Sequence, residues 1–141
     1  MRKKRYVWLC LMLLGIGLLL VSCGDDDDDN DLAPGSVQGK TYRMIVTSGT
    51  LPLARSGTAA ITFAADGTYA VTGEVTIGND QGTYTYNKAT DDSGELTLTS
   101  TLIDWLQITY VFVFTQEGAG NFTGTLVSDP AVTQQGTFTE L

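Results

Sequence analysis

The side chains that could do covalent chemistry are few in this sequence of 141 residues. It contains no histidine and two cysteines, Cys10 and Cys23. Without histidine the usual Ser–His–Asp and Cys–His arrangements are excluded, and so is a zinc site built from Cys and His. Cys10 lies inside an apolar run, so Cys23 is the single thiol of the remaining chain and no internal disulfide is expected there.

Carboxylates are the other groups able to act as acid and base, as they do in glycoside cleavage. The aspartates of the folded part fall in predicted turns, where aspartate usually serves backbone conformation. Glu74 and Glu95 fall on solvent-facing strand positions, and no surrounding is predicted that would raise a carboxyl pKa. The segment from Asp91 to Glu95 lacks the alternating spacing of a calcium loop. We therefore expect no enzyme, no cofactor and no metal; the turn aspartates are Asp66, Asp80, Asp91, Asp92 and Asp129.

The amino terminus has the pattern of a signal peptide. Arg2 to Arg5 form a basic cluster, and the residues from Tyr6 to Val21 are an uncharged, mainly apolar run. As a helix this run would span about 24 Å, which is short of the ~30 Å hydrocarbon core of a bilayer. A basic start, a short apolar segment and a small residue before the break predict a signal peptide over residues 1–22.

The junction after the apolar run is more specific. Leu20-Val21-Ser22-Cys23 closely resembles the lipobox of bacterial lipoproteins. The resemblance implies that the thiol of Cys23 receives a diacylglyceryl group, that the chain is cut between Ser22 and Cys23, and that the new amino group is acylated. Two or three acyl chains such as palmitate hold a protein firmly on a membrane.

An acidic run follows Cys23. Asp25 to Asp29 are consecutive aspartates, which repel one another and bury nothing, so residues 23–36 are predicted to be a disordered tether. The run is similar to the export signal of surface lipoproteins of Bacteroidetes-type bacteria, which implies a surface-exposed location on the outer membrane. Removal of residues 1–22 leaves four cationic residues against sixteen carboxylates, a net charge of −12. Such a chain has no basic patch for nucleic acid.

From Val37 onward the apolar residues recur with a period of two. The clearest strand runs from Leu106 to Thr115, and tight-turn residues such as Asp66-Gly67 separate the strands. Eight antiparallel strands in an up-and-down meander, closing as a small barrel over residues 37–141, are predicted. A two-sheet β-sandwich is the alternative. The other inward sets are Tyr42/Met44/Val46, Ile61/Phe63, Tyr69/Val71/Val75/Ile77, Tyr84/Tyr86, Leu96/Leu98, Phe122/Leu126 and Phe138.

Residues 38–141 resemble the lipocalin-like small β-barrels of bacterial lipoproteins. The likeness lies in strand count, hairpin order and four Gly-x-aromatic motifs, in which glycine is interpreted as the strand start. No ligand-binding motif of that family is matched, so no functional residue is carried over. The motifs are Gly67-Thr68-Tyr69, Gly82-Thr83-Tyr84, Gly120-Asn121-Phe122 and Gly136-Thr137-Phe138.

Candidate ligand contacts lie in the loops and among the inward tyrosines. The segment from Thr47 to Gly57 is long for a hairpin loop and is predicted to expose Leu51, Leu53 and Arg55, either as a lid over the barrel end or as an ordinary mobile loop. Trp105 is either an exposed contact or a core plug. The tyrosines line a small cavity or fill the barrel, and the many bulky inward residues favour filling; they are Tyr42, Tyr69, Tyr84, Tyr86 and Tyr110.

These features predict a membrane-anchored lipoprotein that displays a non-catalytic module. Its partner would be a small ligand, a glycan or another protein. A purely structural protein of the cell envelope is the main alternative, and a carboxylate hydrolase is a third.

Overall fold

The computed structural model describes residues 31–141. The predicted signal peptide, the Ser22–Cys23 cleavage and lipidation site, and the acidic run up to Asn30 lie outside the described residues.

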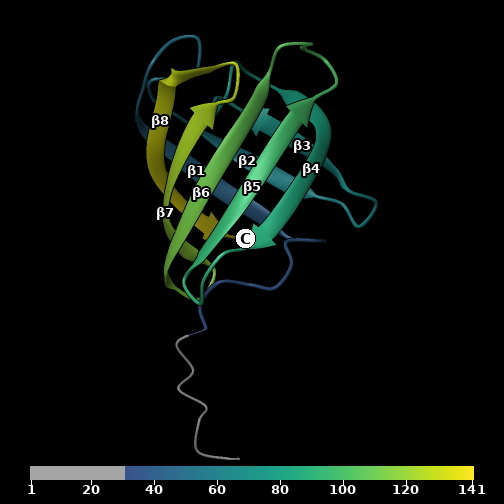
Figure 1. Ribbon diagram of the computed structural model, residues 1–141, viewed down its shortest axis with the longest axis vertical. Coiled ribbons are helices and arrows are strands. Elements are labelled where there is room, and N and C mark those ends of the chain that lie inside the picture. The colour runs from purple at the N-terminus through teal and green to yellow at the C-terminus, as the bar shows by residue number, and fades with distance from the viewer. Residues whose placement is uncertain (1–30) are drawn as a thin grey trace, which may run out of the picture.

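The described chain forms eight strands that follow one another around a closed antiparallel barrel (Figure 1). The all-β barrel prediction is confirmed. The strands are β1 (Thr41–Gly49), β2 (Gly57–Phe63), β3 (Thr68–Gly73), β4 (Asp80–Lys88), β5 (Ser93–Ser100), β6 (Gln107–Gln116), β7 (Ala119–Leu126) and β8 (Asp129–Glu140).

Pairing between the first and last strands closes the barrel. Tyr42 lies opposite Glu140 and Gly49 opposite Gln134, so β1 and β8 are antiparallel neighbours. This closure rules out the β-sandwich alternative. Every strand has two neighbours within residues 31–141, so the sheet needs no part of residues 1–30 to be complete.

Alternation along the strands fills the barrel with aromatic rings. In β6, Ile108, Tyr110, Phe112 and Phe114 point inward and are at most 2% exposed. The rings of Phe112 and Phe138, from β6 and β8, stack with centroids 4.6 Å apart. Such contacts add to the burial of the rings themselves. The prediction of a filled interior therefore agrees with the packing.

Inward glycines allow neighbouring strands to approach closely. A Cβ at Gly136 would collide with the carbonyl oxygen of Ile45 on β1, and one at Gly82 would collide with that of Thr99 on β5. Both glycines are buried inside strands rather than at strand starts. In the motifs at Gly82 and Gly136 the glycine thus reflects crowding of the barrel wall. Gly67, with φ of +85° and no atom within 4 Å of an added Cβ, instead lies in the turn just before β3, as predicted.

The third strand is shorter than its apolar pattern predicts. β3 ends at Gly73, whose φ of +112° suits glycine, and residues 74–79 form a loop. The amide of Gly73 donates to Oδ1 of Asn79 across this loop, 2.9 Å apart. Val75 is buried as predicted, but Ile77 is 42% exposed, so its assignment to the inward set is wrong.

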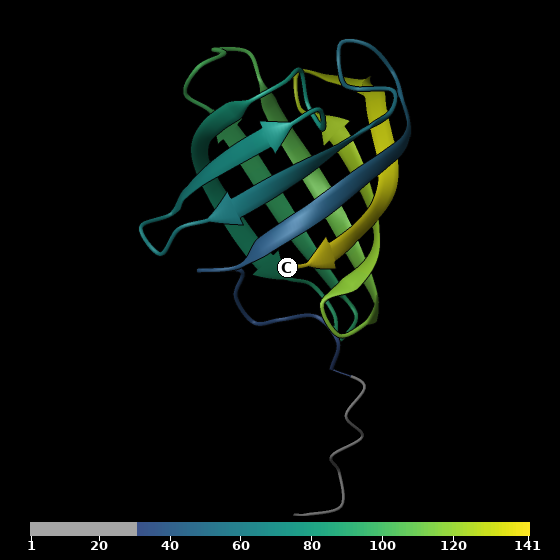
Figure 2. The ribbon, with the colours of Figure 1, turned by 180° about the vertical axis from the view of Figure 1, so that it is seen from behind.

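The meander gives the barrel two distinct ends. We call the end formed by residues 50–56, 74–79, 101–106 and 127–128, together with Asp129 at the start of β8, the distal rim. The opposite end, the base, holds residues 31–40, the other three connections and the carboxyl terminus (Figure 2). The described chain therefore enters at the base.

Candidate functional site

The tyrosines predicted as ligand contacts are engaged within the protein. The hydroxyl of Tyr84 donates to the carbonyl of Ala64 at 2.9 Å, and that of Tyr86 donates to the carbonyl of Pro34 at 2.9 Å. The ring of Tyr84 packs edge-on against Phe63, with centroids 4.8 Å apart. Both tyrosines line an open surface hollow of about 300 Å³ near the base, beside residues 35–38, rather than a cavity inside the barrel.

The β1–β2 loop divides its apolar residues between core and surface. Leu53 is fully buried, so the prediction that it is exposed on a lid is wrong. Burial of a leucine side chain is worth about 2 kcal/mol, which explains why this residue turns inward. Leu51 is 61% exposed and Arg55 is exposed, as predicted. The buried side chain of Leu53 therefore holds the loop against the barrel core.

A buried carboxylate lies where a turn was predicted. Asp80 is the first residue of β4 and only 4% exposed, so its placement in a solvated turn is wrong. Its Oδ2 accepts a hydrogen bond from the Tyr69 hydroxyl and its Oδ1 accepts one from the Ser100 hydroxyl, both 2.6 Å long. Short, charge-assisted bonds of this kind are stronger than neutral ones.

Ser100 extends this network to the distal rim. Its Oγ accepts hydrogen bonds from the amides of Leu102 and Ile103, at 3.1 and 3.0 Å. The side chain of Asp80 thus orients Ser100, which in turn orients the first residues of the β5–β6 loop.

A second buried polar pair lies on β6 and β8. Gln134 is 2% exposed, and its Nε2 donates to the Tyr110 hydroxyl at 2.6 Å. Its Oε1 is buried and has no hydrogen-bond partner within the described residues. Such an orphan acceptor carries a desolvation cost.

Burial changes the acidity of these phenols. The pKa of Tyr110 is raised by burial, although the hydrogen bond from Gln134 acts in the opposite direction. The pKa of Tyr69 is raised by burial and further by its hydrogen bond to the Asp80 carboxylate and by the charge of that carboxylate. The pKa of Tyr42 is also raised, mainly by burial and then by the charge of Glu140. These groups therefore stay neutral in the folded protein over an unusually wide pH range.

Residues 31–36, assigned to the tether from their composition, lie against the base together with Val37. Ala33 and Val37 are buried, and the amide of Ala33 donates to the carbonyl of Asp91 at 2.7 Å. Asp31 forms a salt bridge with Lys88 on β4. The folded unit thus begins several residues before the predicted boundary at Val37.

A shallow hollow of about 680 Å³ opens beside this segment at the base. The salt bridge between Lys40 and Glu140 lies along it, with Nζ and Oε1 2.6 Å apart. Another hollow, of about 390 Å³, lies over β3 and β4 on the outer wall and includes Gln81 and Thr83. Both open to solvent rather than into the barrel.

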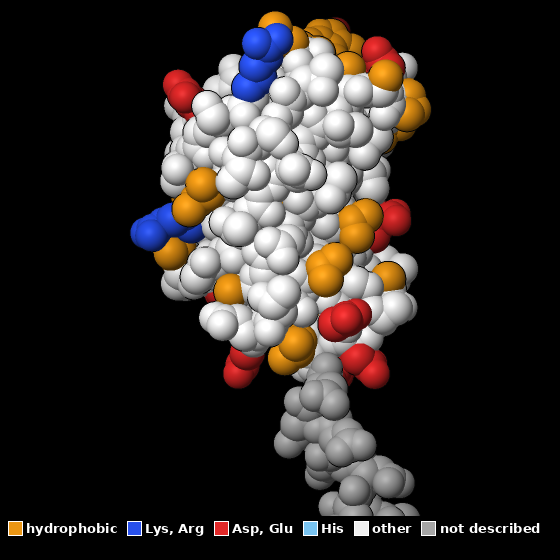
Figure 3. Space-filling view, turned by 90° about the vertical axis from the view of Figure 1, so that its left-hand side faces the viewer, with side chains coloured by type: hydrophobic (Ala, Val, Ile, Leu, Met, Phe, Trp, Pro, Cys, Tyr) orange, Lys and Arg blue, Asp and Glu red, His pale blue; other side chains and the backbone are white. Residues whose placement is uncertain are grey.

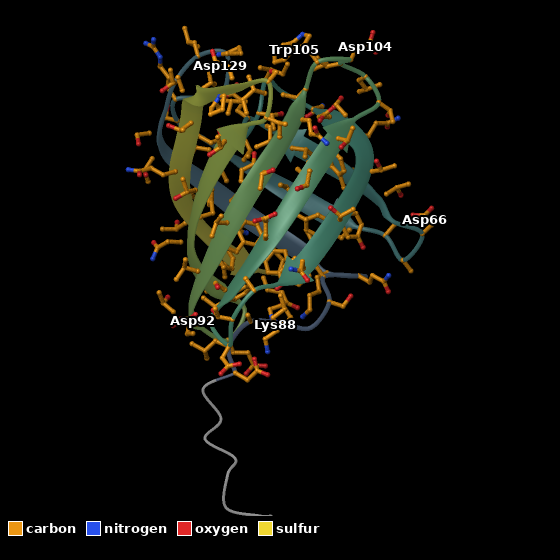
Figure 4. All side chains as sticks on the ribbon, in the orientation of Figure 1. Asp66, Lys88, Asp92, Asp104, Trp105 and Asp129 are labelled. Atoms are coloured by element: carbon orange, nitrogen blue, oxygen red, sulfur yellow. The ribbon has the colours of Figure 1, made fainter. Side chains whose placement is uncertain are left out.

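The distal rim displays large apolar side chains on all four of its loops. Trp105 is 47% exposed, so it lies on the surface and is not a core plug. Figure 3 shows hydrophobic side chains gathered at the upper end of the molecule, and Figure 4 places Trp105, Asp104 and Asp129 there. The exposed apolar residues of the rim are Leu51, Ile77, Leu102, Trp105 and Val127.

Only Leu51 and Trp105 of this set were predicted. Ile77 was assigned to a strand, while Leu102 and Val127 were not singled out. For Ile77 and Val127 the available signal was a large aliphatic residue next to a run of turn residues, where packing on a sheet does not require it. The mainly apolar segment 101–106 offered no such signal for Leu102.

The described residues offer no metal cluster and no membrane-crossing helix. Within residues 31–141, no group of three or more Cys, Asp or Glu side chains is arranged to hold a metal ion. No helix in the same range is long and apolar enough to cross a bilayer. Comparison of the chain with family models, with curated proteins and with solved structures finds no match.

Proposed function

We propose that this protein is a bacterial lipoprotein that holds a non-catalytic β-barrel at a membrane surface and binds a partner through the outside of that barrel. The sequence Leu20-Val21-Ser22-Cys23 supports attachment through lipid on Cys23. The acidic run from Asp25 to Asp29 supports export to the outer membrane with the barrel facing outward.

One geometric observation carries the binding role. The barrel interior is packed with side chains, and the described chain enters at the end opposite the exposed distal rim. An eight-stranded barrel either is filled by side chains or holds one small ligand. Because this one is filled, recognition would use the outer surface, and the rim is the end that a tether from the base leaves free.

The length of the tether fits this arrangement. Seven residues, from Gly24 to Asn30, separate the lipidated cysteine from the first described residue, Asp31. Fully extended they reach about 25 Å, and repulsion among the aspartates favours extension. The base would then lie near the membrane and the distal rim would point away from it.

A purely structural envelope protein is the second candidate, and the packed interior is the observation that favours it. The two functions differ at the distal rim. A binding module needs the exposed apolar residues there, whereas a structural protein does not.

The test of attachment compares Cys23→Ser with Cys10→Ser in cells that produce the full chain. Cys10 lies in the segment that is removed on cleavage, so it is the matched control. We expect the Cys23 variant to leave the membrane fraction in detergent-free extracts and to lose the lipid mass, while the Cys10 variant keeps both. Retention of the Cys23→Ser variant on the membrane with normal maturation would refute the proposal.

Protease treatment of intact cells tests the location. We expect the barrel to be removed from whole cells without opening of the envelope. Protection until the outer membrane is permeabilised would refute outward display.

A further inference from the structure

The distal rim combines exposed apolar residues with a net negative charge. We propose that it is a docking surface for a protein whose apolar patch is bordered by lysine or arginine side chains. This inference rests on the proposed function, since it names the partner of the displayed barrel.

The apolar residues of the rim are not explained by the fold. Val111 and Val113 on the outer wall of β6 are 44% and 41% exposed, but a β-branched residue suits a strand whatever its partner. Leu51, Leu102 and Trp105 lie in loops, where no sheet needs them, and are 47–61% exposed. A group of exposed apolar residues at one end of a soluble domain is typical of an interaction site, and tryptophan is enriched among residues that carry binding energy.

The rim loops are held in place before any partner arrives. Leu53 anchors the β1–β2 loop in the core, and its amide donates to the carbonyl of Thr50 at 3.1 Å. The β5–β6 loop is fixed by Ser100 and by a hydrogen bond from the amide of Leu106 to the carbonyl of Ile103, 2.9 Å long. A surface that is already ordered loses little conformational freedom on binding.

The net charge of the distal rim indicates which class of partner it would bind. The described residues of the rim include three carboxylates and one guanidinium, that of Arg55. Arg55 forms no salt bridge within the described part of the chain. A basic border on the partner would complement this charge and would speed association at low salt. The carboxylates are Glu74, Asp104 and Asp129.

The same charges disfavour two other occupants. Insertion of the rim into a bilayer would carry Asp104, the neighbour of Trp105, out of water, which is costly. A second copy docked rim to rim would place like carboxylates together and would direct the two tethers in opposite directions, which one membrane cannot accommodate.

A peptide titration tests the proposal with residues 24–141, which contain the whole closed barrel. The probe is an amphipathic peptide of leucine and lysine, and the control peptide carries glutamate at every lysine position. Trp105 is the single tryptophan after residue 22, so its fluorescence reports contact at the rim. We expect the lysine peptide to shift the emission to shorter wavelength and to bind at least about tenfold more tightly than the glutamate peptide.

Matched variants separate the rim from the wall. Leu51→Ser combined with Leu102→Ser should weaken binding of the lysine peptide by about tenfold or more, while Val111→Ser combined with Val113→Ser should leave it within about twofold. Equal binding of the two peptides, loss only in the wall variant, or no binding would overturn the proposal. Sedimentation of the domain as a dimer, or its flotation with phosphatidylcholine vesicles, would also overturn it. None of these results depends on whether the Cys23→Ser variant leaves the membrane fraction. Failure of the docking proposal can therefore be distinguished from failure of the proposed lipid attachment.

Discussion

The hydroxyl of Ser100 donates a 2.6 Å hydrogen bond to the buried carboxylate of Asp80 and links the barrel interior to the distal rim. The Oγ of Ser100 also accepts hydrogen bonds from the amides of Leu102 and Ile103, at the start of the loop that contains Trp105. The conformation of an exposed loop is therefore fixed by a charge inside the barrel.

Replacement of Ser100 by alanine should loosen the β5–β6 loop. The variant removes the acceptor of two amides, so hydrogen exchange at Leu102 and Ile103 should accelerate, and stability should fall by about 1–3 kcal/mol. Exchange at Thr68, whose amide is bonded to Asp66 in a different turn, should not change. Unchanged exchange at both loop amides would show that Ser100 does not hold the loop.

Replacement of Asp80 by alanine should cost more than replacement of Tyr69 by phenylalanine. The first change leaves two buried hydroxyls without their acceptor, whereas the second leaves the carboxylate with the Ser100 bond. We expect a loss of about 2–5 kcal/mol for Asp80→Ala and about 1–2 kcal/mol for Tyr69→Phe, measured by urea unfolding. The reverse order would contradict the network.

Tyr110 and Gln134 should be energetically coupled. Tyr110→Phe leaves the Gln134 amide without its acceptor, and Gln134→Met leaves the phenol without its donor. The double variant leaves neither polar group, so it should be more stable than the sum of the two single losses predicts, by about 1 kcal/mol. Strict additivity in a double-mutant cycle would refute the coupling.

Stability should fall in alkaline solution. Folding raises the pKa of Tyr69 and Tyr110, while in the unfolded chain both titrate near pH 10. Below about pH 10 the phenols are protonated in both states and their contribution is fully present. Above it, only the unfolded state releases protons, so unfolding becomes easier by about 1.4 kcal/mol per pH unit for a group such as Tyr110.

Urea unfolding between about pH 9 and pH 12 measures this slope. The slope should be shallower in Tyr110→Phe than in the unaltered protein, and phenolate absorbance should appear together with unfolding. A free energy of unfolding that stays constant across this range would contradict the raised pKa values.

The fold was predictable from the sequence because each strand buries one face. The strict alternation of β6 and the Asp66-Gly67 turn, in which Oδ1 of Asp66 accepts the amide of Thr68, are both local features. Asp80 was misplaced because aspartate next to Gly78 and Asn79 resembles a turn, and only the approach of Tyr69 and Ser100 explains its burial.

The candidate site was predictable only in part. The exposure of Trp105 and the burial of Leu53 depend on which loop residues reach the core, and this is decided by barrel closure rather than by local pattern. The rim as a whole emerges only when four connections far apart in the sequence are brought to one end.

Quenching of Trp105 in the lipidated protein on phosphatidylcholine vesicles tests the central claim most directly. If the barrel stands on its tether with the distal rim away from the bilayer, the protein floats with the vesicles, acrylamide in the water quenches the emission, and brominated phospholipids leave it unchanged. Quenching by the brominated phospholipids, or failure of the lipidated protein to float, would contradict the account.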